Sequence, residues 1–171
     1  MLKKSLVDLI NLQVNREFYS AYMYLDMASY ATEHGLIGFA KWFKVQAQEE
    51  KDHALYFAEY LQHVGAPVVY DTISKPERNY KDVEEMLKEQ LRHEQFVTAS
   101  IGNILGEAIK EKDYLTQEYL QWFIREQGEE EKNANDLILA FGLYGKNPAS
   151  LMELDHGVGK REYHKSVPSL D

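Results

Sequence analysis

The sequence predicts an all-α protein: a four-helix bundle with one long crossover and a short fifth helix, forming a single domain over residues 1–171. Its four prolines all lie outside residues 5–64 and 80–145, so long helices are permitted in both stretches. Within these stretches apolar residues recur every three or four positions, which is the period of an α-helix. No strand-like alternation competes with this pattern.

The first two helices are each bounded by glycine. The first is expected over about residues 6–31, where Leu6 and Ile10 begin its apolar stripe. It ends before Gly35, because glycine readily takes the left-handed conformation that caps a helix. The second is expected over about 38–64 and ends at a glycine-alanine-proline sequence. The turn between them is so short that the pair should form an antiparallel hairpin.

The second pair of helices follows a long linker. Residues 66–81 contain two prolines and no helical period, so they are expected to be extended. The third helix is expected over about 82–111, and the fourth from an N-cap at Asp113 to Tyr144. A helix of ~27 residues is ~40 Å long, and the linker can span ~53 Å. It can therefore run the length of the bundle and leave the second and third helices parallel.

A short helix and a tail are expected to close the chain. An asparagine-proline pair is a good start signal for a fifth helix over about residues 148–163, followed by a tail at 164–171. Gly157 and Gly159 are poor helix formers and leave the end of this helix open. The bundle itself is expected over about 5–145.

Composition excludes several classes of function. A formal net charge of −9 argues against nucleic acid and anionic membranes as partners, while an acidic surface that attracts cations remains open. The absence of cysteine excludes disulfides, thiolate metal sites and cysteine nucleophiles. No apolar run approaches the ~20 residues that span a bilayer, and the N-terminus lacks the features of a signal peptide. The expectation is a cytoplasmic protein.

Each long helix interrupts its own apolar stripe near the middle with polar residues. Glu17 and Glu50 are 33 residues apart, as are Glu94 and Gln127, so the two hairpins place these groups at matching heights. The set comprises Glu17 on the first helix, Glu50 and His53 on the second, Glu94 on the third, and Gln127 and Glu130 on the fourth, flanked by Glu49 and Glu126.

Buried carboxylates at one level of a bundle require a compensating cation. Each ionised carboxylate in a core costs several kcal/mol unless it is paired or bound to metal, and no lysine or arginine lies on these stripes. Carboxylates with one imidazole suit iron, manganese or zinc. A lone Glu-x-x-His pair is more often solvated surface, but four helices with matching polar residues favour a two-metal site.

Neighbouring residues allow further roles. Tyr24, two turns after Glu17, is either a core tyrosine or a hydroxyl beside the metals. Trp122 is either a packing residue or an electron donor. Glu126 and Glu130 share a helix face that could hold a third cation, with Glu129 either joining it or being solvated. The other histidines show no partner pattern and are expected at the surface: His34, His63, His93, His156 and His164.

The chain resembles the non-haem bacterial and archaeal ferritins over about residues 3–155. The matching segments are NREFYSAYMYLDMASY (15–30), GFAKWFKVQAQEEKDHA (38–54), HEQF (93–96) and LQWFIREQGEEE (120–131). Gly128 in the fourth helix and the segment 155–164 depart from the family pattern.

The resemblance implies a ferritin-like fold and a di-iron ferroxidase centre. One iron would be held by Glu17, Glu50 and His53, and the other by the bridging Glu50 with Glu94 and Glu130, near Gln127. A third site would use Glu49, Glu126, Glu129 and Glu130. Tyr24 and Trp122 match the family's tyrosine beside the centre and tryptophan near it.

The implied function is an iron-storage ferritin that oxidises Fe(II) with O2 or peroxide and stores ferric mineral in a homo-oligomeric shell of 24 subunits. The alternative is a di-metal oxidase or metal-binding protein of the same fold that does not mineralise. No haem is expected, because Lys51 follows the bridging glutamate where a bacterioferritin would carry its haem-ligating methionine.

Overall fold

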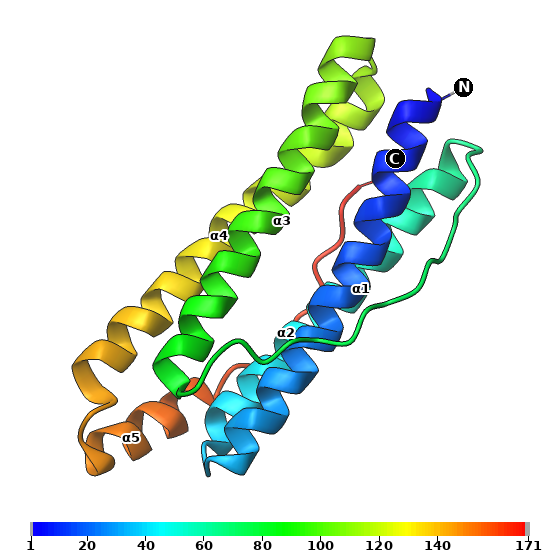
Figure 1. Cartoon of the computed structure of the whole chain (residues 1–171). Helices are drawn as coiled ribbons and strands as arrows, with labels where there is room; N and C mark the ends of the chain where they lie inside the picture. Colours follow the sequence, from blue (N-terminus) through cyan, green and yellow to red (C-terminus); the bar gives the residue numbers. More distant parts are fainter. Residues whose placement is uncertain (1, 170–171) are drawn as a thin grey trace.

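The computed structural model describes residues 2–169 and contains a four-helix bundle with a fifth helix at one end (Figure 1). The all-α fold and the four-helix bundle are confirmed. Across residues 2–169, no helix combines the length and apolarity needed to cross a membrane. The helices are α1 (Lys4–Glu33), α2 (Ile37–His63), α3 (Val83–Glu111), α4 (Tyr114–Tyr144) and α5 (Pro148–Val158).

Local signals define most helix ends. The Asp113 carboxylate accepts a hydrogen bond from the Thr116 backbone N–H at 3.2 Å, as expected of an N-cap. Asp82 caps α3 in the same way, accepting from Glu85 N–H at 2.8 Å. Gly35, between α1 and α2, has a φ of +75°, a conformation that glycine adopts without steric cost.

The crossover between α2 and α3 runs along α1 (Figure 1). Near its start, the side chain of Asn11 accepts from the Val69 backbone N–H at 2.6 Å. Near its end, Arg78 pairs with Asp26 at 2.8 Å and Glu33 at 2.9 Å. The linker is thus attached to α1 toward each of its ends. It carries the chain from one end of the bundle to the other.

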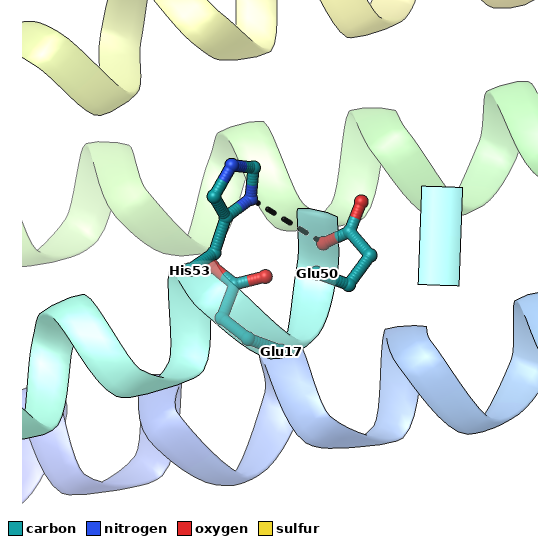
Figure 2. Close-up of side chains that lie close together, drawn as sticks. All are labelled: Glu17, Glu50 and His53. Atoms are coloured by element: carbon teal, nitrogen blue, oxygen red, sulfur yellow. Dashed lines mark ion pairs between the residues drawn. The ribbon is translucent and has the colours of Figure 1, made fainter. Parts of the chain in front are cut away.

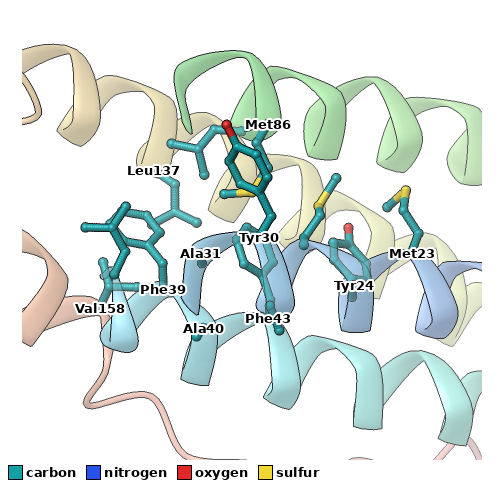
Figure 3. Close-up of a cluster of buried hydrophobic side chains, with 14 of the residues drawn as sticks. Met23, Tyr24, Tyr30, Ala31, Phe39, Ala40, Phe43, Met86, Leu137 and Val158 are labelled. Atoms are coloured by element: carbon teal, nitrogen blue, oxygen red, sulfur yellow. The ribbon is translucent and has the colours of Figure 1, made fainter. Parts of the chain in front are cut away.

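Two hydrophobic clusters fill the bundle, and a polar layer separates them. Along α1, Glu17 lies between Val14 of one cluster and Met23 of the other. The cluster near α5 includes Tyr24, Phe39, Phe43, Met86 and Leu137 (Figure 3). Because apolar residues close both ends of the polar layer, its side chains are held away from bulk water.

Helix α5 is shorter than expected, because it ends at Val158 and not near residue 163. The Asp155 carboxylate caps the N-terminus of α2, accepting from the backbone N–H groups of Gly38 and Phe39, both at 2.9 Å. The approach is so close that a Cβ on Gly38 would lie 1.7 Å from the Asp155 carbonyl oxygen. A long-range contact therefore fixes α5, and after Gly159 the chain turns back along α2.

Candidate metal centre

The polar layer contains the predicted ligands from all four long helices. Each of these side chains is almost fully buried, with at most 5% of the residue exposed. The bundle thus buries all six residues predicted for the two-metal site: Glu17, Glu50, His53, Glu94, Gln127 and Glu130.

Three of these residues already form a compact ligand group. One ligand atom from each of Glu17, Glu50 and His53 lies within 4.8 Å of the others. Glu17 comes from α1, whereas Glu50 and His53 lie one turn apart on α2 and face the same space (Figure 2). His53 Nδ1 is 3.6 Å from Glu50 Oε2.

Two glutamines orient the carboxylates of this group. Gln13 donates to Glu17 Oε1 at 2.7 Å, and Gln46 donates to Glu50 Oε1 at 2.9 Å. In each case the donor precedes the acceptor by four residues on the same helix. The second oxygen of Glu17 is buried and has no hydrogen-bond partner among the described residues. An orphaned buried carboxylate oxygen is costly, so this atom is available for a cation.

Helices α3 and α4 supply the other half of the layer. The Tyr24 hydroxyl donates to Glu94 Oε1, and the Gln127 amide donates to Glu94 Oε2 at 3.1 Å. Both oxygens of Glu94 are therefore held in place. The second oxygen of Glu130, like that of Glu17, is buried without a partner in the described part of the chain.

Burial makes the metal-free carboxylates take up protons. Desolvation, with the charge of Glu50 as the next cause, raises the pKa of both Glu17 and Glu130 from 4.5 to about 8. The same two causes raise the pKa of Glu94 well above its usual value. Without a cation, the layer therefore reduces its own negative charge by protonation.

Glu50 and His53 behave differently because they interact directly. Burial raises the pKa of Glu50, but the hydrogen bond and charge of His53 outweigh burial and hold that pKa below 4.5. Burial lowers the pKa of His53, but the hydrogen bond and charge of Glu50 outweigh it and raise that pKa to about 10. The imidazolium is thus the built-in counter-charge of the metal-free centre.

The donor set fits a pair of divalent cations. Within residues 2–169, no lysine or arginine forms an ion pair with Glu17, Glu50, Glu94 or Glu130. Four carboxylates and one imidazole, with two unpartnered oxygens, suit iron, manganese or zinc. A two-metal site in a helical bundle is typically built from such facing carboxylates.

The acidic residues predicted for a third site differ in their burial. Glu49 is mostly buried and pairs with Arg161 from the C-terminal tail. Glu126 is partly exposed, and Glu129 is fully on the surface. Glu49 and Glu126 line one small cavity together with His53. The third site stays a prediction, and it already contains the positive charge of Arg161.

The expected surface position of His93 is wrong, whereas the other four histidines expected there are exposed. His93 is only 9% exposed, and its Nε2 lies 2.7 Å from the Ser20 hydroxyl of α1. Burial lowers its pKa, so it is a neutral hydrogen-bonding group beside the polar layer.

Trp122 packs edge-on against His53, with ring centroids 5.5 Å apart.

The glutamines that orient the ligands were not anticipated as functional residues, although a signal for them exists. Gln13, Gln46 and Gln90 each precede a layer glutamate by four residues. Gln90 does not donate to Glu94 as the other two glutamines donate to their glutamates. Both polar atoms of its amide are buried without a partner in the described structure.

Comparisons with known proteins agree with this architecture. The family model for the ferritin-like domain matches residues 7–141. A bacterial non-haem ferritin of Campylobacter jejuni is 35% identical over 155 residues, covering 91% of this chain and 93% of the relative. A probable non-haem ferritin-like protein of Haemophilus influenzae is 34% identical, covering 93% and 96%.

Solved structures show the same likeness. An open-pore ferritin from the hyperthermophilic archaeon Archaeoglobus fulgidus is 34% identical and superimposes with a TM-score of 0.92, covering 95% of this chain and 100% of the other. A closed form of that ferritin, engineered by mutagenesis, gives a TM-score of 0.93 at 35% identity, covering 96% and 100%. With the family model, the relatives and the fold in agreement, the chain belongs to the ferritin family, among the bacterial and archaeal non-haem ferritins.

Proposed function

We propose that this protein oxidises Fe(II) at the buried carboxylate layer and stores the ferric product. The observation that supports this most directly is the ligand group of Glu17, Glu50 and His53, which is buried and has an unpartnered oxygen on Glu17. Iron is the substrate that this donor set suits, since hard carboxylates favour the ferric product.

The proposed roles follow from where each side chain lies. Glu17 and His53 would hold one iron, and Glu50 would bridge it to a second. Glu94 and Glu130 would complete the second position. Gln127 and Tyr24 would act through Glu94, because both donate hydrogen bonds to its carboxylate.

Two iron positions match the electron count of the reaction. Each Fe(II) gives one electron, and O2 accepts the two electrons and two protons to leave as hydrogen peroxide. When peroxide is the oxidant, two electrons and two protons convert it to two water molecules. Holding both ions against one bridging carboxylate makes the two-electron step possible in one site.

Storage requires a shell, and we propose the 24-subunit assembly of the family. Exposed apolar side chains at the α4–α5 end supply surface for subunit contacts: Leu139, Leu143 and Met152 are 66%, 76% and 70% exposed. Large exposed apolar side chains grouped on one part of a protein are typical of an interaction surface.

The decisive experiment adds well over two Fe(II) per subunit in air and follows ferric absorbance together with particle mass. Storage predicts continued oxidation into a mineral inside a particle far larger than a dimer. Oxidation that stops near two irons per chain, on a particle no larger than a dimer, would leave a di-metal oxidase that does not mineralise.

Single substitutions test the assigned centre. Glu50→Ala and His53→Ala should each abolish fast Fe(II) oxidation and leave the bundle folded, because each removes a central ligand. Glu59→Ala and His63→Ala are matched controls, since both residues are exposed on the same helix. An unchanged initial rate in the Glu50 or His53 variant would show that iron is oxidised elsewhere.

A further inference from the structure

We propose that Arg161 occupies the cation position beside Glu49 and thereby limits the centre to two metal ions. The inference rests on the proposed two-metal function of the layer. It concerns a residue of the C-terminal tail, which lies outside the four helices that carry the ligands.

The guanidinium of Arg161 contacts three side chains at once. Its Nη2 forms an ion pair with Glu49, its Nη1 donates to Gln46 Oε1 at 2.7 Å, and its guanidinium carbon lies 4.1 Å from the centre of the Trp42 ring. The Arg161 and Glu49 side chains are only 16% and 18% exposed. A planar guanidinium that pairs, donates and stacks at once is held far more firmly than a surface lysine.

The position of the guanidinium connects it to the metal layer. Gln46 accepts from Arg161 and donates its own amide to Glu50, the proposed bridge, at 2.9 Å. Glu49, His53 and Glu126 line a shared cavity of about 20 Å³, which has room for about one water molecule. The nearby Glu130 has a buried oxygen without a partner among the described residues.

The tail that carries Arg161 also covers this cavity. The Tyr163 hydroxyl donates to Asp52, and the Lys165 ammonium lies 6.0 Å from the centre of the Tyr56 ring. Tyr163, His164 and Lys165 line the cavity opposite α2 and α4. In Figure 1 the segment after α5 runs back beside α2. The docking of Asp155 on α2 fixes where this segment begins.

Charge then explains the limit to two ions. A divalent cation at Glu49 would lie within a few ångströms of the guanidinium, and the two positive charges would repel each other in a poorly solvated site. Such an ion would have to displace Arg161 from Glu49, Gln46 and Trp42 together. The charge of Glu49 is therefore compensated by the protein itself.

The test is metal stoichiometry in the assembled, metal-free protein at neutral pH, with Co(II) as a probe that does not turn over. Isothermal titration should give two ions per subunit for the unmodified chain, both lost or weakened at least tenfold in Glu50→Ala, which removes the proposed bridge. Arg161→Gln should bind a third ion, and adding Glu49→Gln to it should return the number to two.

Lys160→Gln is the matched control, because it removes an exposed positive charge from the adjacent position of the same tail. It should keep two ions. Three ions in the unmodified protein, or two in Arg161→Gln with unchanged affinities, would overturn the role of Arg161 while leaving the two-metal centre intact. An unmodified chain that binds no Glu50-dependent pair would overturn both.

Discussion

In the polar layer, some side chains are candidate metal ligands and others orient those ligands by hydrogen bonds. Glu17 and Glu50 each have one oxygen held by a glutamine four residues earlier, which leaves the other oxygen for a cation or for His53. The burial of the candidate ligands was predictable, because a carboxylate on an apolar stripe is conspicuous. His93 was not, since its burial depends on Ser20 of another helix.

The two glutamines on α2 and α3 offer a matched comparison. Gln46→Leu removes the donor to Glu50 and should lower the free energy of unfolding of the metal-free protein by ~1–3 kcal/mol, because a buried acceptor loses its partner. Gln90→Leu removes an amide whose polar atoms have no described partner, so it should leave stability unchanged or raised. Thermal unfolding of both variants measures this. Equal losses would contradict the hydrogen-bond assignment.

At the scale of helices, boundaries set by local chemistry were predictable, whereas packing set by distant contacts was not. The N-cap at Asp113 and the turn at Gly35 could be read from neighbouring residues. The docking of α5 could not, because it depends on Asp155 reaching the first turn of α2. The path of the tail, and hence the contact of Arg161 with Glu49, depends on that docking.

Two glycine substitutions test the docking of α5. Gly38→Ala places a methyl group against the Asp155 backbone, so α5 must move away and α2 loses a cap worth ~1 kcal/mol. Gly128→Ala has no atom within 4 Å of the new methyl and should stabilise α4 by ~0.5–1 kcal/mol. Thermal midpoints should therefore move in opposite directions. A Gly38 variant as stable as the unmodified chain would mean that α5 does not pack as described.

For the whole molecule, the layer makes stability depend on pH and on metal. Glu17 and Glu130 have pKa values near 8 in the folded state against 4.5 ordinarily, and that of His53 is near 10 against 6.5. The folded state therefore binds more protons than the unfolded state between pH 4.5 and about 8 at the two glutamates, and between pH 6.5 and about 10 at His53. Stability therefore falls as pH rises through this window.

Metal-free protein should thus unfold at a lower temperature at about pH 8 than at about pH 6, and Zn(II) should reverse the trend because it replaces the protons. Glu17→Gln should flatten the metal-free dependence, since it removes one of the titrating groups. Thermal midpoints with and without Zn(II) provide the measurement. A metal-free midpoint that rises over this range would contradict the protonation of the layer.

The central claim is that the buried layer is a two-metal centre, and anomalous diffraction from crystals soaked anaerobically in Fe(II) tests it most directly. The structure predicts two peaks about 3.5–4 Å apart, one bounded by Glu17, Glu50 and His53 and the other by Glu50, Glu94 and Glu130. A single peak, or peaks confined to surface carboxylates with the layer empty, would contradict it.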